Sequence, residues 1–262
     1  MTKRLFFIIL LIFTFNKVKA QDTNNALDFN DSLVVLAPKN MSYALTEIFR
    51  AYSTKYNRKI TGSFNNLNIL MKDILEGKQA NIIITDHTDW ITSFKQKGLI
   101  NISSITNLVE DRLALVTSKE FYNFNSHKLA ELTDYQAKAN FYQNFTLFLP
   151  KWTDDMAGMY AHEALKNMKY LFNSKNKIIE ILNPADELSK INDSIAIIRY
   201  SESYDNPNIN IIEVIDAQYH RRFIYQIAII AGENMEEARN FLEFITNDEI
   251  LKIFTKHGFQ NI

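Results

Sequence analysis

The sequence has no cysteine, and this absence excludes several kinds of feature. It excludes a disulfide framework, a thiolate metal site and a cysteine nucleophile. It also leaves no cysteine near the start of the chain that could carry a lipid anchor. We therefore expect a protein that is held together by its hydrophobic core alone and that has no membrane anchor in its mature form.

The common signatures of catalysis are also missing. The chain contains no G-x-S-x-G, no H-E-x-x-H and no glycine-rich phosphate loop. The stretch DHTD, Asp86 to Asp89, gathers carboxylates and a histidine, but a polar loop that caps the following helix explains it better than a metal site. His162 and Glu163 lie on a predicted helix without a second histidine at metal-binding spacing. The sequence therefore predicts no enzyme activity, no metal and no cofactor.

One long apolar run is present, at the beginning of the chain. The basic start MTKR is followed by eleven apolar or weakly polar residues, LFFIILLIFTF, and by VKA directly before Gln21. This order is typical of a secretory signal peptide at residues 1–20. The run is too short for the roughly 20 apolar residues that a bilayer-spanning helix needs. We expect the protein to be exported, and a bacterial periplasm suits a chain without cysteine best.

The charge balance argues against nucleic acid as a partner. Cleavage after Ala20 would leave 25 basic and 30 acidic residues, a formal charge of −5. Nucleic-acid-binding proteins present basic surfaces instead. With 47% hydrophobic residues the chain can build a sizeable core, and we expect a monomer.

The spacing of apolar residues predicts two similar halves. The first half reads as a strand at 33–37, a helix from 41 to 52, a strand near Ile60, a helix at 67–75 and a strand at 81–85. The second half repeats this order, with strands and helices alternating at 145–149, 156–172, 177–182, 185–191 and 194–200. Each half is a β-α-β-α-β unit, which is typical of a parallel sheet flanked by helices.

Two further passages connect these halves. Residues 110–118 and 221–232 read as strands that cross from one lobe to the other, and the helices at 235–247 and 248–259 return to the first lobe. The sequence thus predicts an α/β fold of two lobes with a ligand cleft between them. Lobe 1 would comprise 21–112 and 225–262, and lobe 2 would comprise 113–224.

Several segments resemble a known family. The most specific are LVVLAPKNMSYALTEI, ITGSFNNLNILMKDILEGKQANIIITDHTDWI and DMAGMYAHEAL, and they are joined by NPADELSKI, SIAIIRYSES and ARNFLEFITNDEILKIFTKHGF. In order and spacing the chain resembles the periplasmic molybdate-binding proteins of ABC transporters, which have the type-II periplasmic binding-protein fold. The resemblance runs from about Leu33 to Phe259.

The resemblance implies a site for a small oxyanion. Proteins of that family hold their ligand with two serine hydroxyls, a tyrosine and main-chain N–H groups. The positions that match these groups are Asn40, Leu67 beside Asn66, Ala157, Leu188 and Arg199. Asn40, Leu67 and Arg199 differ from the family's residues, so the ligand site is divergent.

The divergent positions allow alternatives. Asn40 can donate to a ligand, or it can cap the following helix through the N–H of Ser42 or Tyr43. Arg199 can fork onto an anion, with Lys39 as a possible second charge, or it can pair with Glu202 or another acid at the rim.

The implied function is that of an exported solute-binding protein of an ABC importer, which captures molybdate or another small oxyanion without a chemical step. The ABC permease is a partner implied by the resemblance only. The alternative is a degenerate relative that binds no ligand and acts as a protein-interaction or sensory module.

Overall fold

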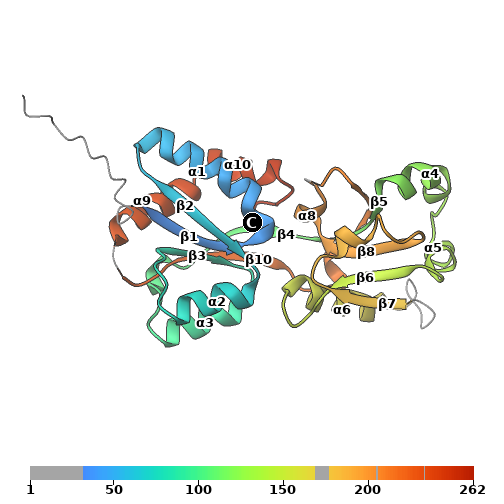
Figure 1. Cartoon of the computed structure of the whole chain (residues 1–262), viewed down its shortest axis with the longest axis horizontal. Coiled ribbons are helices and arrows are strands. Elements are labelled where there is room, and N and C mark those ends of the chain that lie inside the picture. Colours follow the sequence, from blue (N-terminus) through green and yellow to red (C-terminus); the bar gives the residue numbers. More distant parts are fainter. Residues whose placement is uncertain (1–31, 169–176, 205, 233) are drawn as a thin grey trace, which may run out of the picture. The chain divides into compact units, whose positions relative to one another are not determined.

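The computed structural model describes residues 32–168, 177–204, 206–232 and 234–262. The part from Ser32 to Ile262 is one compact unit, drawn in Figure 1. The predicted signal peptide at 1–20 and the end of the helix predicted at 156–172 lie outside the described residues. Within the described part of the chain, no helix is long and apolar enough to cross a membrane.

The first sheet has five strands in the order β2-β1-β3-β10-β4. β1 pairs in parallel with β2 and β3, whereas β10 runs antiparallel to both β3 and β4. The strands are β1 (Leu33–Pro38), β2 (Ile60–Asn65), β3 (Ile82–Thr85), β4 (Thr106–Asp111) and β10 (Phe223–Ile229). A strand from late in the chain therefore completes a sheet that the early part of the chain begins.

The second sheet repeats this plan in the order β7-β6-β8-β5-β9. β6 pairs in parallel with β7 and β8, and β5 runs antiparallel to β8 and β9. The strands are β5 (Leu113–Ser118), β6 (Thr146–Pro150), β7 (Lys177–Ile181), β8 (Ser194–Arg199) and β9 (Ile209–Val214). The chain passes between the sheets twice, from β4 to β5 with Arg112 alone between them, and from β9 to β10.

Helices flank both sheets. With the first sheet are α1 (Ser42–Tyr56), α2 (Leu67–Leu75), α3 (Thr88–Gln96), α9 (Met235–Ile245) and α10 (Asp248–Lys256), and the short 3-10 helices η2 (Lys39–Met41) and η3 (Ile102–Ser104). With the second sheet are α4 (Lys119–Ala130), α5 (Tyr135–Tyr142), α6 (Met156–Asn167), α7 (Pro184–Glu187), α8 (Tyr200–Tyr204) and η4 (Ala217–Tyr219).

The alternation of side chains along β1 explains why helices cover both faces of the first sheet. Leu33, Val35 and Ala37 point to one face and pack into a core that α1, α9 and α10 share. Leu36 points to the other face, into a core with α2 and α3. Figure 1 shows α1 and α10 on one side of this sheet and α2 and α3 on the other. The inner strands β1 and β3 are buried on both faces, as expected for a parallel sheet between helices, whereas the edge strand β2 is partly exposed.

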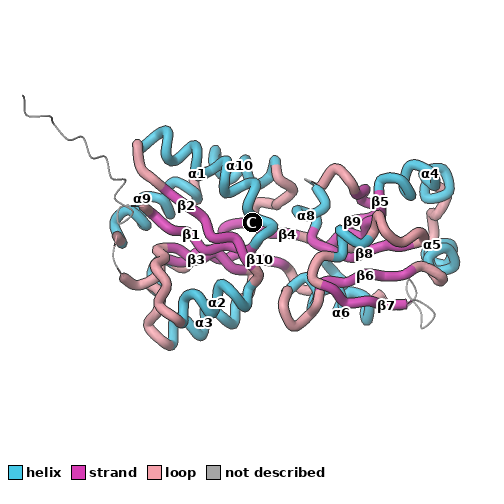
Figure 2. Tube along the Cα trace, in the orientation of Figure 1, coloured by secondary structure: helices cyan, strands magenta, loops and turns pink. Residues whose placement is uncertain are grey.

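The second sheet has the same two-faced construction. Leu147 and Leu149 of β6 join a core with α6, whereas Phe148 between them packs with Leu188, directly after α7. Figure 2 shows the strands of each sheet together with the helices and loops around them. The predicted α/β class with two helix-flanked sheets is therefore confirmed.

Some elements differ from the prediction. The passage at 110–118 is two strands rather than one, because the chain leaves the first sheet after Asp111 and enters the second at Leu113. The strand predicted at 194–200 ends at Arg199, and α8 begins directly after it. The short helix predicted at 185–191 is only Pro184–Glu187. β9 and the helices α4, α5 and α8 were not predicted.

Candidate functional site

Arg199, the last residue of β8, gathers three carboxylates around its guanidinium group. Its Nη2 lies 2.6 Å from Oδ2 of Asp86, which directly follows β3 of the first sheet. Its Nη1 lies 2.6 Å from Oδ1 of Asp155, at the start of α6, and 3.4 Å from Oε1 of Glu202 in α8. We call these four residues the Arg199 cluster. It joins the carboxyl ends of strands from both sheets, which is where ligands bind in open α/β folds.

The members of the Arg199 cluster differ in burial. The side chains of Arg199 and Asp86 are 3% and 0% exposed, whereas those of Asp155 and Glu202 are 30% and 31% exposed. A buried ion pair attracts strongly but loses the hydration of both charges. The Arg199–Asp86 pair is therefore a fixed link between the two sheets. Asp155 and Glu202 lie on the side of the Arg199 cluster that faces solvent.

Burial governs the protonation of this cluster. It raises the pKa of Asp86 above its ordinary value, against the attraction of Arg199, and it raises the pKa of Glu202 to about 7. Burial also disfavours the charge of Arg199, but Asp155, Tyr225 and Asp86 raise its pKa well above the ordinary value. Arg199 therefore stays a cation.

Two atoms of the cluster lack a protein partner. Among the described residues, no hydrogen-bond partner reaches the buried Oδ1 of Asp86 or the buried Nε of Arg199. Buried polar atoms are nearly always paired, so each such atom calls for an explanation. One is an acceptor and the other a donor, and both belong to the residues that link the two sheets.

Asp155 connects the cluster to the start of α6. Its Oδ1 accepts a hydrogen bond from the main-chain N–H of Ala157 at 2.7 Å, which makes it the N-cap of this helix. Gly158 fixes the position of this helix end, because a Cβ there would lie 2.2 Å from the carbonyl oxygen of Pro150 and 2.7 Å from the main-chain nitrogen of Trp152. The first turn of α6 is thus pressed against the loop after β6, and the oxygen that accepts from Ala157 N–H is the one that Arg199 contacts.

Asn40 takes part in a second contact between the two sheets. Its Nδ2 donates to Ser201 Oγ of α8 at 2.9 Å and to the hydroxyl of Tyr225 in β10 at 2.8 Å. Ser201 Oγ in turn donates to Oδ2 of Asp111 at 2.6 Å. Burial raises the pKa of Asp111 to about 6, although the hydrogen bond from Ser201 lowers it. Asn40 does not cap α1, so the capping alternative for this residue was wrong.

The other residues singled out in the sequence have local partners. Asn66 is the N-cap of α2, where its side chain accepts from the N–H of Ile69, and Leu67 is the first residue of that helix. Leu188 is buried, and its carbonyl oxygen accepts from Ser194 Oγ at 3.4 Å. Lys39 lies exposed in η2. The structure brings Arg199 and the start of α6 together, whereas Asn66 and Lys39 form no hydrogen bond or ion pair with them among the described residues.

The carboxylates around Arg199 were not predicted as part of the site. Asp86 lies in the loop before α3, as predicted, but it does not cap that helix: His87 holds the N-cap position without a side-chain hydrogen bond, and Asp86 binds Arg199. Arg199 does pair with Glu202, as one alternative held, but at a buried position and not at a rim. A signal was available, since Asp86 and Arg199 each stand at the carboxyl end of a predicted strand. Within the described parts of the chain, no group of three or more histidine and acidic residues is arranged to hold a metal.

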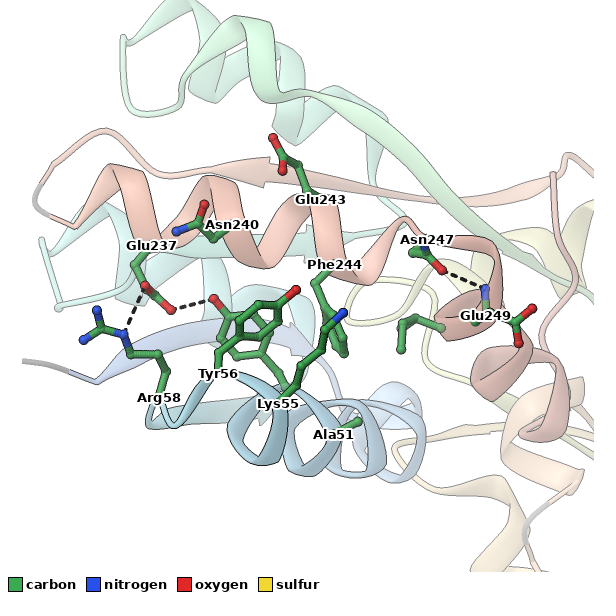
Figure 3. Close-up of a pocket in the computed structure, with 12 residues that line it drawn as sticks. Ala51, Lys55, Tyr56, Arg58, Glu237, Asn240, Glu243, Phe244, Asn247 and Glu249 are labelled. Atoms are coloured by element: carbon green, nitrogen blue, oxygen red, sulfur yellow. Dashed lines mark hydrogen bonds and ion pairs between the residues drawn. The ribbon is translucent and has the colours of Figure 1, made fainter.

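A separate groove lies on the first lobe, between α1, α9 and the start of α10, and is shown in Figure 3. It has a volume of about 960 Å³ and is lined mainly by Tyr52, Tyr56 and Phe244 together with charged and amide side chains. At one end Glu237 accepts from the hydroxyl of Tyr52 at 2.5 Å and lies 3.6 Å from Arg58. None of these residues was singled out in the sequence.

Comparison with known sequences identifies relatives of nearly the whole described chain. The sequence profile of one family, described as bacterial extracellular solute-binding protein, matches residues 33–260. A Bacillus subtilis protein, described as a proposed ABC transporter substrate-binding lipoprotein, is 24% identical over 87% of this chain and 86% of its own length. The molybdate-binding protein ModA of Haemophilus influenzae is 23% identical over 87% of this chain and 89% of its own length.

Solved structures agree on the fold. The periplasmic molybdate-binding protein of Azotobacter vinelandii has a TM-score of 0.68 at 12% identity, covering 87% of this chain and 98% of that protein. Identity this low supports the shared fold alone. The resemblance inferred from the sequence, to molybdate-binding proteins with two lobes, is thereby confirmed.

Proposed function

We propose, from the premise that this chain belongs to the family of bacterial extracellular solute-binding proteins, that it captures a small oxyanion between two lobes for an ABC importer. One lobe would comprise 21–112 and 225–262, and the other 113–224. The protein would carry out no chemical step. Relatives described as molybdate-binding support the ligand class.

The observation that carries the proposal is the position of two donors at the junction of the sheets. The guanidinium group of Arg199 and the N–H of Ala157 both point at one carboxylate oxygen, Oδ1 of Asp155. A cation and a helix N-terminus that converge on one oxygen are an anion-binding arrangement. A solute oxyanion that replaced this carboxylate would meet donors from β8 and α6, with the first lobe attached through Asp86.

The proposal includes export, a permease partner and a monomeric state. The order of basic, apolar and small residues at 1–20 supports a cleaved signal peptide, and the description of a relative as an ABC transporter substrate-binding protein supports the partner. Expression of the full chain in a bacterium tests export directly. We expect a periplasmic protein whose measured mass corresponds to a chain that begins at Gln21. An unprocessed cytoplasmic chain would contradict the proposal.

Ligand capture is tested by thermal unfolding of the exported protein with molybdate, tungstate, sulfate, phosphate and small carboxylates. A ligand at a hundred times its Kd stabilises the folded state by about 2.7 kcal/mol, which corresponds to a rise in Tm of about 5–10 °C at this size. A rise with any oxyanion supports the proposal and identifies the solute. No rise with any member of the panel would contradict it.

A further inference from the structure

The strongest unexplained feature of the site is that it already contains an anion. Oδ1 of Asp155 takes a hydrogen bond from Ala157 N–H at 2.7 Å and lies 2.6 Å from Nη1 of Arg199. These are the same two donors that a bound oxyanion would need. In this structure the side chain of Asp155 therefore stands where an oxygen of the proposed solute would stand.

The charges of the cluster explain why the carboxylate of Asp155 matters for binding an anion. Three carboxyl groups, those of Asp86, Asp155 and Glu202, surround the single guanidinium of Arg199. An additional anion would add to an excess of negative charge, because like charges at short distance in a partly buried site repel. A solute oxyanion can bind Arg199 favourably only if one carboxylate leaves it or loses its charge.

Of the three carboxylates, Asp155 is the one that occupies both donors and can also turn toward water. Asp86 is 0% exposed and holds the other sheet, and Glu202 touches Arg199 only at 3.4 Å. The side chain of Asp155 is 30% exposed and follows the loop at 151–154, so it can turn toward water. Its departure would free both Nη1 of Arg199 and the N–H of Ala157.

We propose that Asp155 is a tethered competitor of the solute and that its charge determines which oxyanions enter the site. This inference rests on the proposed capture of an oxyanion at Arg199. A tethered group acts at an effective concentration of about millimolar or more. A free oxyanion must outcompete it, which favours solutes with a higher charge or more hydrogen-bond contacts than a single carboxylate.

The test compares variants of the exported protein by calorimetric titration with sodium molybdate, sodium sulfate and sodium phosphate. Asp155→Ser removes the carboxylate and keeps a side chain that caps a helix. Asp155→Asn keeps the shape and the cap and removes only the charge. The matched control is Asp154→Ser, because Asp154 is the neighbouring carboxylate but contacts Asn68 and Lys151 and not Arg199.

We expect Asp155→Ser and Asp155→Asn to bind at least one of the three anions about tenfold or more tighter than the unmodified protein, the range for one charged hydrogen bond. Asp154→Ser should bind as the unmodified protein does. If neither Asp155 variant binds any of the anions more tightly, the inference is overturned. A gain of the same size in Asp154→Ser would also overturn the inference, since the loss of any nearby negative charge would then raise the affinity.

The outcome separates this inference from the proposed function. Binding by the Asp155 variants alone contradicts oxyanion capture by the native chain and, with it, the selection of solutes by Asp155, which would then block the site. Binding by the unmodified protein that does not improve in either variant overturns the inference and leaves the proposed function in place. No binding by any of the four proteins contradicts both.

Discussion

Two arginine–carboxylate groups of this protein have similar chemistry and opposite surroundings. In the groove of the first lobe (Figure 3), Arg58 lies 3.6 Å from Glu237, with side chains that are 58% and 22% exposed. In the Arg199 cluster, Arg199 lies 2.6 Å from Asp86, with side chains that are 3% and 0% exposed. Water screens the first pair and is excluded from the second.

This difference indicates which of the two places should respond more strongly to a change of charge. The groove satisfies its carboxylate with Tyr52 and Arg58, and the contact with the exposed Arg58 is open to water. The Arg199 cluster holds one cation among three carboxylates, together with two unpartnered atoms. Changes of charge should therefore have large effects in the cluster and small effects in the groove.

The largest effect is expected for Arg199→Ala. The variant leaves the carboxyl group of Asp86 buried without its cation, and breaking one side of a buried ion pair costs about 3–5 kcal/mol. Urea unfolding at pH 8 measures this loss. It should shrink in acid, because protonation of Asp86 removes the unpaired charge. A loss below about 1 kcal/mol, the range of a surface pair, would make the two arginine sites equivalent and contradict the comparison.

The second effect concerns the neutral contact between the sheets. Asn40→Ala leaves Ser201 and Tyr225 without the amide that donates to them, and removal of one buried hydrogen-bond partner costs about 1–3 kcal/mol. Urea unfolding measures this change, with the exposed Asn68→Ala as the control. Asn68 also donates between the lobes, to Asp154 at 3.0 Å, but at an exposed position. Equal losses in both variants would show that burial does not decide the contribution of these contacts.

The third effect is a dependence of stability on pH. Burial raises the pKa of Glu202 from its ordinary 4.5 to about 7, so the folded state holds a proton that the unfolded state releases. This stabilisation is complete below pH 4.5 and is lost as the pH rises through 7. The unfolding free energy should fall across this window by up to about 1.4 kcal/mol per pH unit for one proton.

Glu202→Gln should flatten this pH dependence, because the amide is neutral at every pH in the window. Unfolding series from pH 5 to 8 on both proteins measure the two slopes. Part of the slope should persist in the variant, since burial raises the pKa of Asp111 to about 6 as well. Identical slopes in the two proteins would mean that Glu202 is charged throughout.

The smallest effect is expected in the groove. Arg58→Ala removes an exposed ion pair, and such pairs contribute about 0–1 kcal/mol. Thermal unfolding should change little, and solute binding should not change at all. A loss as large as that of Arg199→Ala would show that the groove is a second place where charge is critical.

Much of the fold could be predicted because its signals are local. The run NIIIT predicted a strand, and β3 is Ile82–Thr85. The helical spacing in MEEARNFLEFITN predicted α9, which is Met235–Ile245. β9 (Ile209–Val214) was missed because it is a partly exposed outer strand of its sheet, without the continuous apolar run of a strand that is buried on both faces.

The site was harder to predict because its partners are distant in the sequence. Asp86 and Arg199 are separated by 113 positions, and no spacing rule brings them together. The family resemblance did place Arg199 and Ala157 at the predicted site, and the side chain of Asp155 links these two residues. The charges around Arg199 depend on how three separate elements pack, and a local pattern does not contain that information.

Arg112 is the one residue between β4 of the first sheet and β5 of the second. Because the connection is so short, a rotation of the backbone at Arg112 would move one whole sheet relative to the other. The side chain of Arg112 lies 4.0 Å above the ring of Tyr200 and donates to the carbonyl oxygen of Gly258 at 3.4 Å. Arg112 thus ties the short connection between the two sheets to α8 on one side and to Gly258, near the end of the chain, on the other.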